Sequence, residues 1–323
     1  MELQTVNNIT AEQIASVSTE LPFILANTSY VALDDIRSNH IIPVFVKDNE
    51  PVISHHDFVG CTQEVISHVF KNEVICQPSL RVSHPIKGRI PEAKDKPARE
   101  LFEHEKTIYY ERMAFVIEVP SIRDTINGNE LSLTIGGVKA YNTDNLYSRK
   151  GTDEHFKVFI GFQNKVCCNM CVWSDGFVAD MRVKSTGQLM KNIFELVTNY
   201  RMESHLSRMT KLVDYELTEH QFATLIGRSK LYQYLPSKEK RNIPELKFGD
   251  NQIGIVAKDY YKDESFCREE DGSINPWNVY NLFTGANKQS YIDTFLDRGL
   301  NAFQFATHLE SALQSKSSSW FLS

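Results

Sequence analysis

The chain has 323 residues, a formal net charge of −6, an apolar fraction of 41% and a charged fraction of 24%. These values are typical of a globular protein, and they exclude a surface uniformly basic enough for duplex DNA while leaving room for a local basic groove. Residues 1–5 lack the basic and apolar start of a signal peptide, and no apolar run approaches the roughly 20 residues of a membrane helix. We therefore expect a cytoplasmic protein with no membrane partner, whose six cysteines stay reduced.

The length of the chain suits one large domain or two smaller ones. We predict an N-terminal lead-in at residues 1–40, a single domain at 41–315 and a C-terminal tail at 316–323. Within the domain, residues 41–184 are rich in strand patterns and residues 185–315 in helix patterns.

The first third of the chain mixes elements. A short helix is predicted at 10–19, a proline-containing edge strand at 41–46 and a helix with regularly spaced apolar residues at 56–70. Residues 81–99 hold three prolines, and six lysines and arginines against two acids. This composition predicts an irregular, basic loop.

The middle of the chain alternates between apolar runs and turn signals such as Asn127-Gly128 and Ser174-Asp175-Gly176. Strands joined by such short turns are antiparallel neighbours, so we expect a meander. The predicted strands span residues 109–119, 131–140, 156–162, 166–173 and 177–183.

Helical patterns dominate the last part of the chain. Thr218-Glu219-His220-Gln221 is a capping box, and Asn275 followed by Pro276 is typical of a helix start. Strands first and helices later predict an α+β fold, in which an antiparallel meander packs against C-terminal helices. The predicted helices span residues 186–213, 218–235, 276–285 and 301–314.

Three cysteines lie close together at Cys167, Cys168 and Cys171. On a strand, Cys167 and Cys171 would be roughly 13 Å apart at about 3.3 Å per residue, too far to share a metal ion. We therefore favour small buried side chains over metal ligands. A cysteine nucleophile would need a histidine base, and no local pattern supplies one. We assign no catalytic residue, metal ligand or cofactor.

Basic windows are a further signal. Residues 81–99, 182–211 and 228–247 each hold six lysines and arginines against two acids. Segregated charge of this kind is typical of a groove that follows a nucleic-acid backbone, although exposed helix faces also carry lysines. Tyr232 and Tyr234 lie in the third window, where they would stack bases or belong to the core. The candidate nucleic-acid-binding residues are Arg81, Lys87, Arg89, Lys94, Lys96, Arg99, Arg228, Lys230, Lys238, Lys240 and Arg241.

Three segments, read together and in order, resemble a known group of proteins. They are residues 110–120, a strand ending in proline; residues 165–169, with the pattern Lys-Val-Cys-Cys-Asn; and residues 277–281 with Thr284, where Trp-Asn-Val-Tyr-Asn is followed by threonine. They resemble the bacterial phage/plasmid-like protein family, a domain of unknown function carried on mobile elements. Asn278 departs from the family's usual glycine. The resemblance implies a plasmid, phage or integrative-element origin and a cytoplasmic location, but no established activity.

The motif residues have two interpretations. Short amides satisfy buried backbone groups, and tryptophan and tyrosine bury large apolar surfaces, so a packed interface between the sheet and the C-terminal helices would use these types. Alternatively, a pocket between sheet and helices would bind a small molecule through some of them. The candidate residues are Cys167, Asn169, Trp277, Tyr280, Asn281 and Thr284.

Our leading hypothesis is a non-enzymatic accessory protein of a mobile element that binds nucleic acid, with single-stranded DNA favoured. One alternative is an enzyme or small-molecule-binding protein whose pocket uses Cys167, Asn169, Tyr280 and Asn281. Another is a protein-interaction module that inhibits a host defence system.

Overall fold

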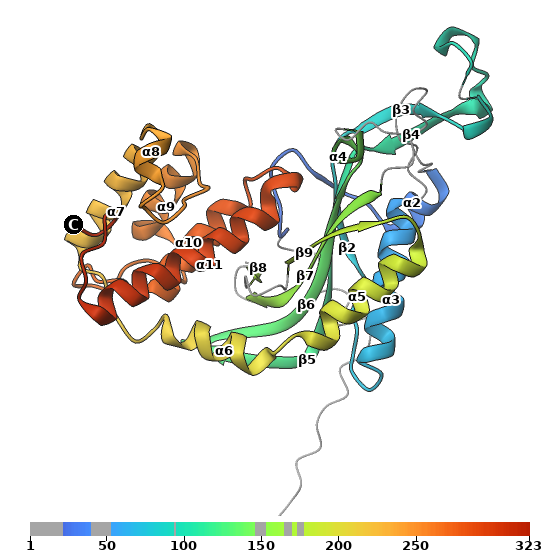
Figure 1. Ribbon diagram of the computed structural model, residues 1–323. Helices are drawn as coiled ribbons and strands as arrows, with labels where there is room; N and C mark the ends of the chain where they lie inside the picture. The colour runs from blue at the N-terminus through green and yellow to red at the C-terminus, as the bar shows by residue number, and fades with distance from the viewer. Residues whose placement is uncertain (1–21, 40–52, 94, 146–152, 165–169, 173–177) are drawn as a thin grey trace, which may run out of the picture.

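The computed structural model of the protein describes residues 22–39, 53–93, 95–145, 153–164, 170–172 and 178–323. Within this part of the chain, seven strands form an antiparallel sheet, two more form a separate arm, and most helices follow the sheet in sequence (Figure 1). The predicted α+β class is therefore confirmed. The strands are β1 (Ser29–Tyr30), β2 (Ser79–Val82), β3 (Pro85–Arg89), β4 (Lys106–Tyr110), β5 (Arg112–Ile126), β6 (Asn129–Ala140), β7 (Glu154–Asn164), β8 (Met170–Val172) and β9 (Val178–Val183). The α-helices are α2 (Leu33–Asn39), α3 (His55–Val69), α4 (Tyr141–Asn145), α5 (Thr186–Asn199), α6 (Met202–Lys211), α7 (Glu219–Tyr232), α8 (Ser237–Lys240), α9 (Asp250–Lys262), α10 (Pro276–Asn287) and α11 (Ile292–Ser315).

The sheet has the strand order β1-β2-β5-β6-β7, and its last strand has two neighbours on one edge. β8 pairs with residues 161–163 of β7, and β9 pairs with residues 154–159 of the same strand. The predicted meander therefore holds from β5 to β7, but β9 returns to β7 and does not pair with β8.

Both faces of the sheet are covered, because its central strands are apolar on both sides. On one face, the Phe58 ring of α3 lies edge-on to Phe115 and Phe156, with ring centroids 5.0 and 4.8 Å apart. On the other face, Phe295 in the first turns of α11 belongs to a cluster with Phe159 of β7 and Phe23 of the N-terminal segment. Figure 1 shows α3 and α5 on one side of the sheet and α11 on the other.

Adjacent glycines let side chains approach β6 closely from both sides. A Cβ on Gly136 would lie 2.8 Å from the Phe159 ring, and a Cβ on Gly137 would lie 2.4 Å from Phe58. Pairing with β5 and β7 continues without interruption through both residues. Gly136 and Gly137 therefore lie inside a regular strand, although glycine within a strand is more typical of a bulge.

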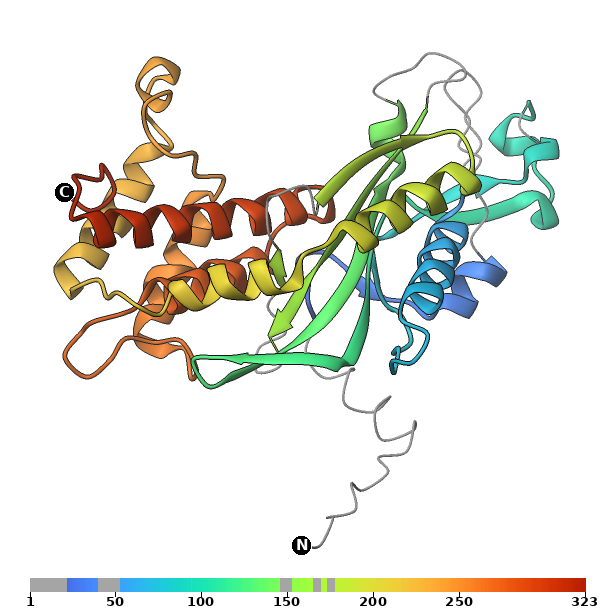
Figure 2. The same cartoon turned by 60° about the horizontal axis from the view of Figure 1, so that its bottom comes forward.

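A bulge does occur in β5, at Pro120. The register with β6 shifts between Val119 and Arg123, where a proline without an N–H cannot join the ladder. The strand then resumes its pairing as far as Ile126 and turns at Asn127 and Gly128, both with positive φ. The predicted strand end at this proline is thus a bend, beyond which the hairpin continues toward the C-terminal helices (Figures 1 and 2).

The helix predicted at 186–213 is two helices. Tyr200 has an extended conformation (φ −67°, ψ 128°) and ends α5, and α6 begins two residues later. α5 lies on the sheet beside α3, whereas Met209 of α6 lies among the C-terminal helices. Because of the break, the apolar side chains of α5 pack on the sheet and α3, and those of α6 pack near the C-terminal helices.

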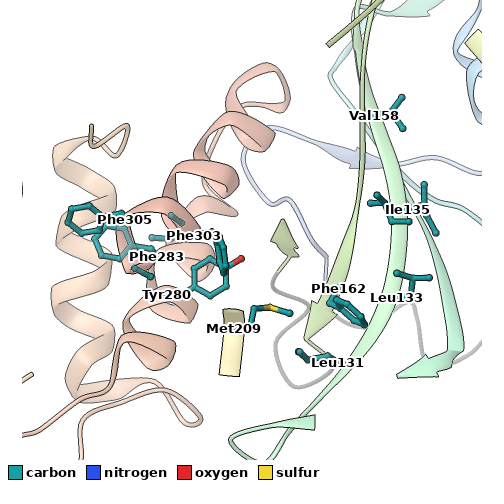
Figure 3. Close-up of a cluster of buried hydrophobic side chains, with 14 of the residues drawn as sticks. Leu131, Leu133, Ile135, Val158, Phe162, Met209, Tyr280, Phe283, Phe303 and Phe305 are labelled. Atoms are coloured by element: carbon teal, nitrogen blue, oxygen red, sulfur yellow. The ribbon is translucent and has the colours of Figure 1, made fainter. Parts of the chain in front are cut away.

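The C-terminal helices share their core with the sheet. Figure 3 shows side chains from β6 and β7, such as Leu131 and Phe162, in one cluster with Met209, Tyr280 and Phe303 of the helices. The helix predicted at 276–285 is α10, with Asn275 as its N-cap, and the helix predicted at 218–235 is α7, with its capping box present. α11 begins nine residues before the predicted position 301 and is 24 residues long. No helix among the described residues is long and apolar enough to cross a membrane.

Both ends of the described chain pack against the domain. Phe23 and Ile24 are buried under α11, and β1 extends the sheet beside β2. At the other end, Phe321 is fully buried, with its ring 4.7 Å from Phe305 and 5.9 Å from Tyr232. The described part of the predicted lead-in, residues 22–39, and the predicted tail, residues 316–323, therefore both contribute side chains to the core.

Two predicted elements cannot be compared with the structure, and a third differs from it. Residues 10–19 and 41–46 lie outside the described residues. The segment 81–99, predicted as an irregular loop, contains part of β2 and the whole of β3, which pairs with β4 to form the arm. Because β3 has only five residues and begins with a proline, its pattern is too short to predict a strand.

Candidate functional site

The motif residues of α10 lie in the core. Trp277 donates from Nε1 to the Asn129 side chain at 3.0 Å, and Asn281 donates to the Trp277 carbonyl at 2.9 Å. Asn164 of β7 donates to the Asn281 side chain at 3.4 Å, and Thr284 donates to the Asn281 carbonyl. None of Trp277, Tyr280, Asn281 and Thr284 is more than 2% exposed. They connect α10 to the ends of β6 and β7.

Two other motif residues, Cys167 and Asn169, lie outside the described residues, as does Cys168. Of the cysteines that the structure describes, Cys61 is buried on α3. Burial, together with the nearby carboxylates of Asp57 and Glu64, raises the pKa of its thiol to about 11. This thiol is therefore protonated at neutral pH and is not an activated nucleophile. The described residues contain no group of three or more His, Cys, Asp or Glu side chains able to hold a metal ion.

The basic residues of the first window lie on or near the β3–β4 arm. Arg81 donates to the Thr28 carbonyl at 2.9 Å and to its hydroxyl at 3.1 Å, and burial lowers its pKa. Lys96 contacts the Glu105 carboxylate, and Arg89 donates a hydrogen bond to the Lys96 carbonyl. Arg99 is exposed with its Nε 3.4 Å from Glu100, Lys87 is also exposed, and Lys94 lies outside the described residues. Lys96 and Arg99 thus lie beside carboxylates, whereas Arg81 and Arg89 donate to neutral carbonyl groups.

The third window lies around the end of α7 and on α8, where some cations are held by internal partners. Arg228 donates to the Ser323 carbonyl at 2.9 Å and stacks on Trp320, and Lys240 donates to the Gln233 carbonyl at 3.2 Å. Lys230 lies 3.6 Å from the Asp250 carboxylate.

The remaining side chains of this region form an exposed patch that we call the α7–α8 surface, made of Leu231, Tyr234, Lys238 and Arg241. Tyr234 is 79% exposed and Leu231 58%, whereas Tyr232 is buried in the core. Lys238 and Arg241 are exposed, and neither has a carboxylate within 4.0 Å in the part of the chain that the structure describes. An exposed aromatic ring and two exposed cations without acidic partners among the described residues therefore occur within residues 234–241.

Of the three basic windows, the first and the third do not merge. Figures 1 and 2 show the β3–β4 arm and α8 at opposite ends of the molecule, with the sheet and α11 between them. A single groove running through residues 81–99 and 228–247 is therefore absent from the described residues.

A cavity of about 470 Å³ lies where the N-terminal segment, the β2–β3 corner and the start of α11 meet. Its lining includes Thr28, Ser83, His84, Arg112 and Tyr291. The walls are fixed by backbone bonds: the N–H groups of residues 25 and 26 donate to the Lys288 carbonyl, and the Ser83 N–H donates to the Arg112 carbonyl. We call this cavity the corner pocket. It lies between sheet and helix, as the pocket hypothesis requires, but none of the residues named in that hypothesis lines it.

A buried ionic cluster lies at the opposite end of β6 from Asn129. Lys139 is fully buried, with its Nζ 2.7 Å from Glu154 and 3.2 Å from Asp144. The same ammonium lies 3.8 Å from the Phe156 ring centroid. The remaining carboxylate oxygens accept from backbone N–H groups of residues 53 and 155, at 3.0 and 2.8 Å.

Sequence reasoning missed both the corner pocket and this cluster. Lys139 has a readable signal, since it occupies an inward position of an otherwise apolar strand that alternates through Leu133, Ile135 and Gly137. The corner pocket has no local signal, because its walls come from four separate parts of the chain, at residues 25–29, 83–84, 112 and 291–292.

Comparison with known proteins gives a family for the chain. No curated protein and no solved structure matches it significantly. Residues 3–322 match the family described as "Domain of unknown function, B. Theta Gene description (DUF3871)". Because the match extends over nearly the whole sequence, the chain belongs to the DUF3871 family.

Proposed function

We propose that this protein binds single-stranded nucleic acid, with DNA favoured, through the α7–α8 surface. The observation that carries the proposal is the 79% exposed Tyr234 ring, followed within seven residues by the exposed cations Lys238 and Arg241. A base stacks on such a ring whatever its identity, while the cations contact the neighbouring phosphates. The protein's net charge of −6 confines this attraction to a small region.

The proposal also extends to the setting in which the protein acts. The three segments that resemble phage/plasmid-like proteins support a role as a cytoplasmic accessory protein of a mobile element, in replication or recombination. Nucleic acid passes through a single-stranded form in both processes, which is the form a stacking surface recognises.

The test measures fluorescence anisotropy of a labelled oligothymidylate of about 15 nucleotides at about 50 mM salt. Because about two cations would contact phosphates, the slope of log Kobs against log salt concentration should be about −1.4. Tyr234→Ala should weaken binding roughly 5- to 160-fold, since stacking on one ring contributes about 1–3 kcal/mol.

A matched control is Tyr30→Ala, which removes another exposed tyrosine, 58% exposed, from strand β1 at the edge of the sheet. It should leave the affinity unchanged. Absence of any anisotropy change at low salt, or equal effects of the two tyrosine substitutions, would refute the proposal.

A further inference from the structure

We propose that the corner pocket is a binding site for a small organic acid with one carboxylate and a compact apolar body. This site is separate from the α7–α8 surface and does not depend on the nucleic-acid proposal. The pocket lies at the N-terminal end of α11, whereas the α7–α8 surface lies near its C-terminal end. A helix of 24 residues separates them by about 36 Å.

The volume and lining of the pocket suit a molecule of this size. Its 470 Å³ falls within the range of roughly 300–1,000 Å³ that small-molecule sites occupy. One part of the lining is apolar, with Leu25, Ala26 and Ile292, and Leu25 is 45% exposed. Tyr291 adds a ring that is 56% exposed. These groups would cover the apolar body of a ligand.

Arg112 supplies the group that would recognise a carboxylate. It lies at the start of β5, and its backbone is fixed to Ser83, whose hydroxyl accepts from the Arg112 N–H at 3.2 Å. The guanidinium is 28% exposed, and its Nε is buried without a hydrogen-bond acceptor among the described residues. A planar guanidinium binds a carboxylate through two parallel hydrogen bonds.

Two acids near Arg112 limit the charge of the ligand. The Asp293 carboxylate lies 3.6 Å from Nε and the Glu111 carboxylate 3.9 Å from Nη2, both beyond hydrogen-bonding distance. They leave the guanidinium's hydrogen bonds available but offset its charge. A dianion such as a phosphate monoester would be repelled by both acids, so the pocket favours a single negative charge.

Polar groups also line the pocket with Arg112. They are His84, Ser83 and Thr28, and the last two donate from their hydroxyls to the His84 and Ile24 carbonyls, each at 3.4 Å. α11 begins at the pocket wall without a side-chain cap on its first turn. Uncapped N–H groups at a helix start favour an anion nearby. The guanidinium and the helix start are thus the groups of the lining that would attract an anion, and Leu25 and Ala26 are among those that would cover an apolar body.

The test uses phenylacetate as the probe, observed by saturation-transfer difference NMR with the full chain. A ligand of about ten heavy atoms should bind with a dissociation constant on the order of 1 mM. Neutral phenylacetamide and cationic 2-phenylethylamine have the same apolar body, and both should bind at least about tenfold more weakly because they cannot accept a charge-assisted pair of hydrogen bonds.

Three variants assign the effect to the pocket. Arg112→Gln should weaken phenylacetate binding at least about tenfold, whereas Asp293→Asn should strengthen it by removing a competing charge. Arg123→Gln is the matched control, because Arg123 is 67% exposed and pairs with Glu130 on the distal hairpin. It should bind as wild type does. Thermal unfolding shows whether Arg112→Gln is folded. If it is not, Asp293→Asn still tests the proposal.

Several outcomes would overturn the proposal. Phenylacetate that binds no better than phenylacetamide would exclude recognition of charge. Unchanged binding in Arg112→Gln, or weaker binding in Asp293→Asn, would place the site elsewhere. Tighter binding of phenyl phosphate than of phenylacetate would refute the assignment of a singly charged ligand.

Discussion

The ammonium of Lys139 is the most consequential single group in the core. It is fully buried and shared between Glu154 and Asp144, which also accept backbone hydrogen bonds from residues 53 and 155. These bonds connect residue 53, residue 144 and residues 154–155 with the end of β6. A buried ion pair of this kind is costly to break from one side, because the partner charges stay behind without compensation.

Lys139→Met should therefore lower the free energy of unfolding by about 3–5 kcal/mol, measured by urea titration at neutral pH. The triple variant Lys139→Met, Asp144→Asn, Glu154→Gln leaves no uncompensated charge and should recover much of that loss. A loss below about 1 kcal/mol in the single variant would show that the carboxylates are not held in a charged, buried state.

His205 makes the fold sensitive to acid. Its ring is buried on α6 between Phe162 and Phe303, and its Nδ1 lies 2.6 Å from the Tyr200 hydroxyl. Burial, followed by the positive charge of Arg208, lowers its pKa from 6.5 to about 3. Between these values the unfolded chain binds a proton that the folded chain does not, so stability is lost as pH falls below 6.5.

The expected loss from this group is roughly 2 kcal/mol between about pH 7.5 and pH 5. His205→Gln keeps an acceptor for Tyr200 but does not titrate, so its unfolding free energy should fall less over the same range. The measurement is the difference between the two pH profiles from urea unfolding. Parallel profiles would show that His205 reaches solvent or protonates in the folded state.

At the scale of elements, β6 is packed most directly at Gly136 and Gly137, where aromatic rings lie against the backbone. Aromatic side chains from α3 and β7 occupy the space that a Cβ would take on each face. Gly137 therefore sets how closely α3 packs on the sheet. The strand's glycines cost backbone entropy, which the close packing of Phe58 and Phe159 offsets.

Gly137→Ala should destabilise the protein by about 1–3 kcal/mol, because the new methyl would lie 2.4 Å from Phe58 and 2.9 Å from the Lys157 carbonyl. The matched control is Gly227→Ala on α7, where nothing lies within 4 Å of the added atom. There the same change should stabilise by about 0.5–1 kcal/mol, through helix propensity. Thermal unfolding of both variants gives the comparison, and equal effects would contradict this account.

At the scale of the whole molecule, local patterns predicted the class of fold and most long elements. The α3 periodicity, the capping box at Thr218 and the Asn275-Pro276 start of α10 each depend on neighbouring residues, and each prediction is confirmed. The break at Tyr200 was not predictable, because the apolar stripe continues across it and only tertiary partners reveal the change.

The candidate sites were harder to predict, for a physical reason. Side-chain charge can be counted in sequence, but whether Lys96 faces solvent or Glu105, and whether Tyr232 or Tyr234 is exposed, depends on the packing of distant segments. The corner pocket depends on four such segments at once. The composition therefore indicated where cations are abundant, and the fold determined which of them are available.

The bend at Pro120 has a consequence for engineering the chain. It directs the distal part of the β5–β6 hairpin toward the C-terminal helices, where Asn129 accepts the indole N–H of Trp277. The exposed turn at Asn127 and Gly128 is the kind of position usually chosen for epitope tags or circular permutation. Here an inserted residue would displace Asn129 from its partner on α10, so such cloning strategies should avoid this tip.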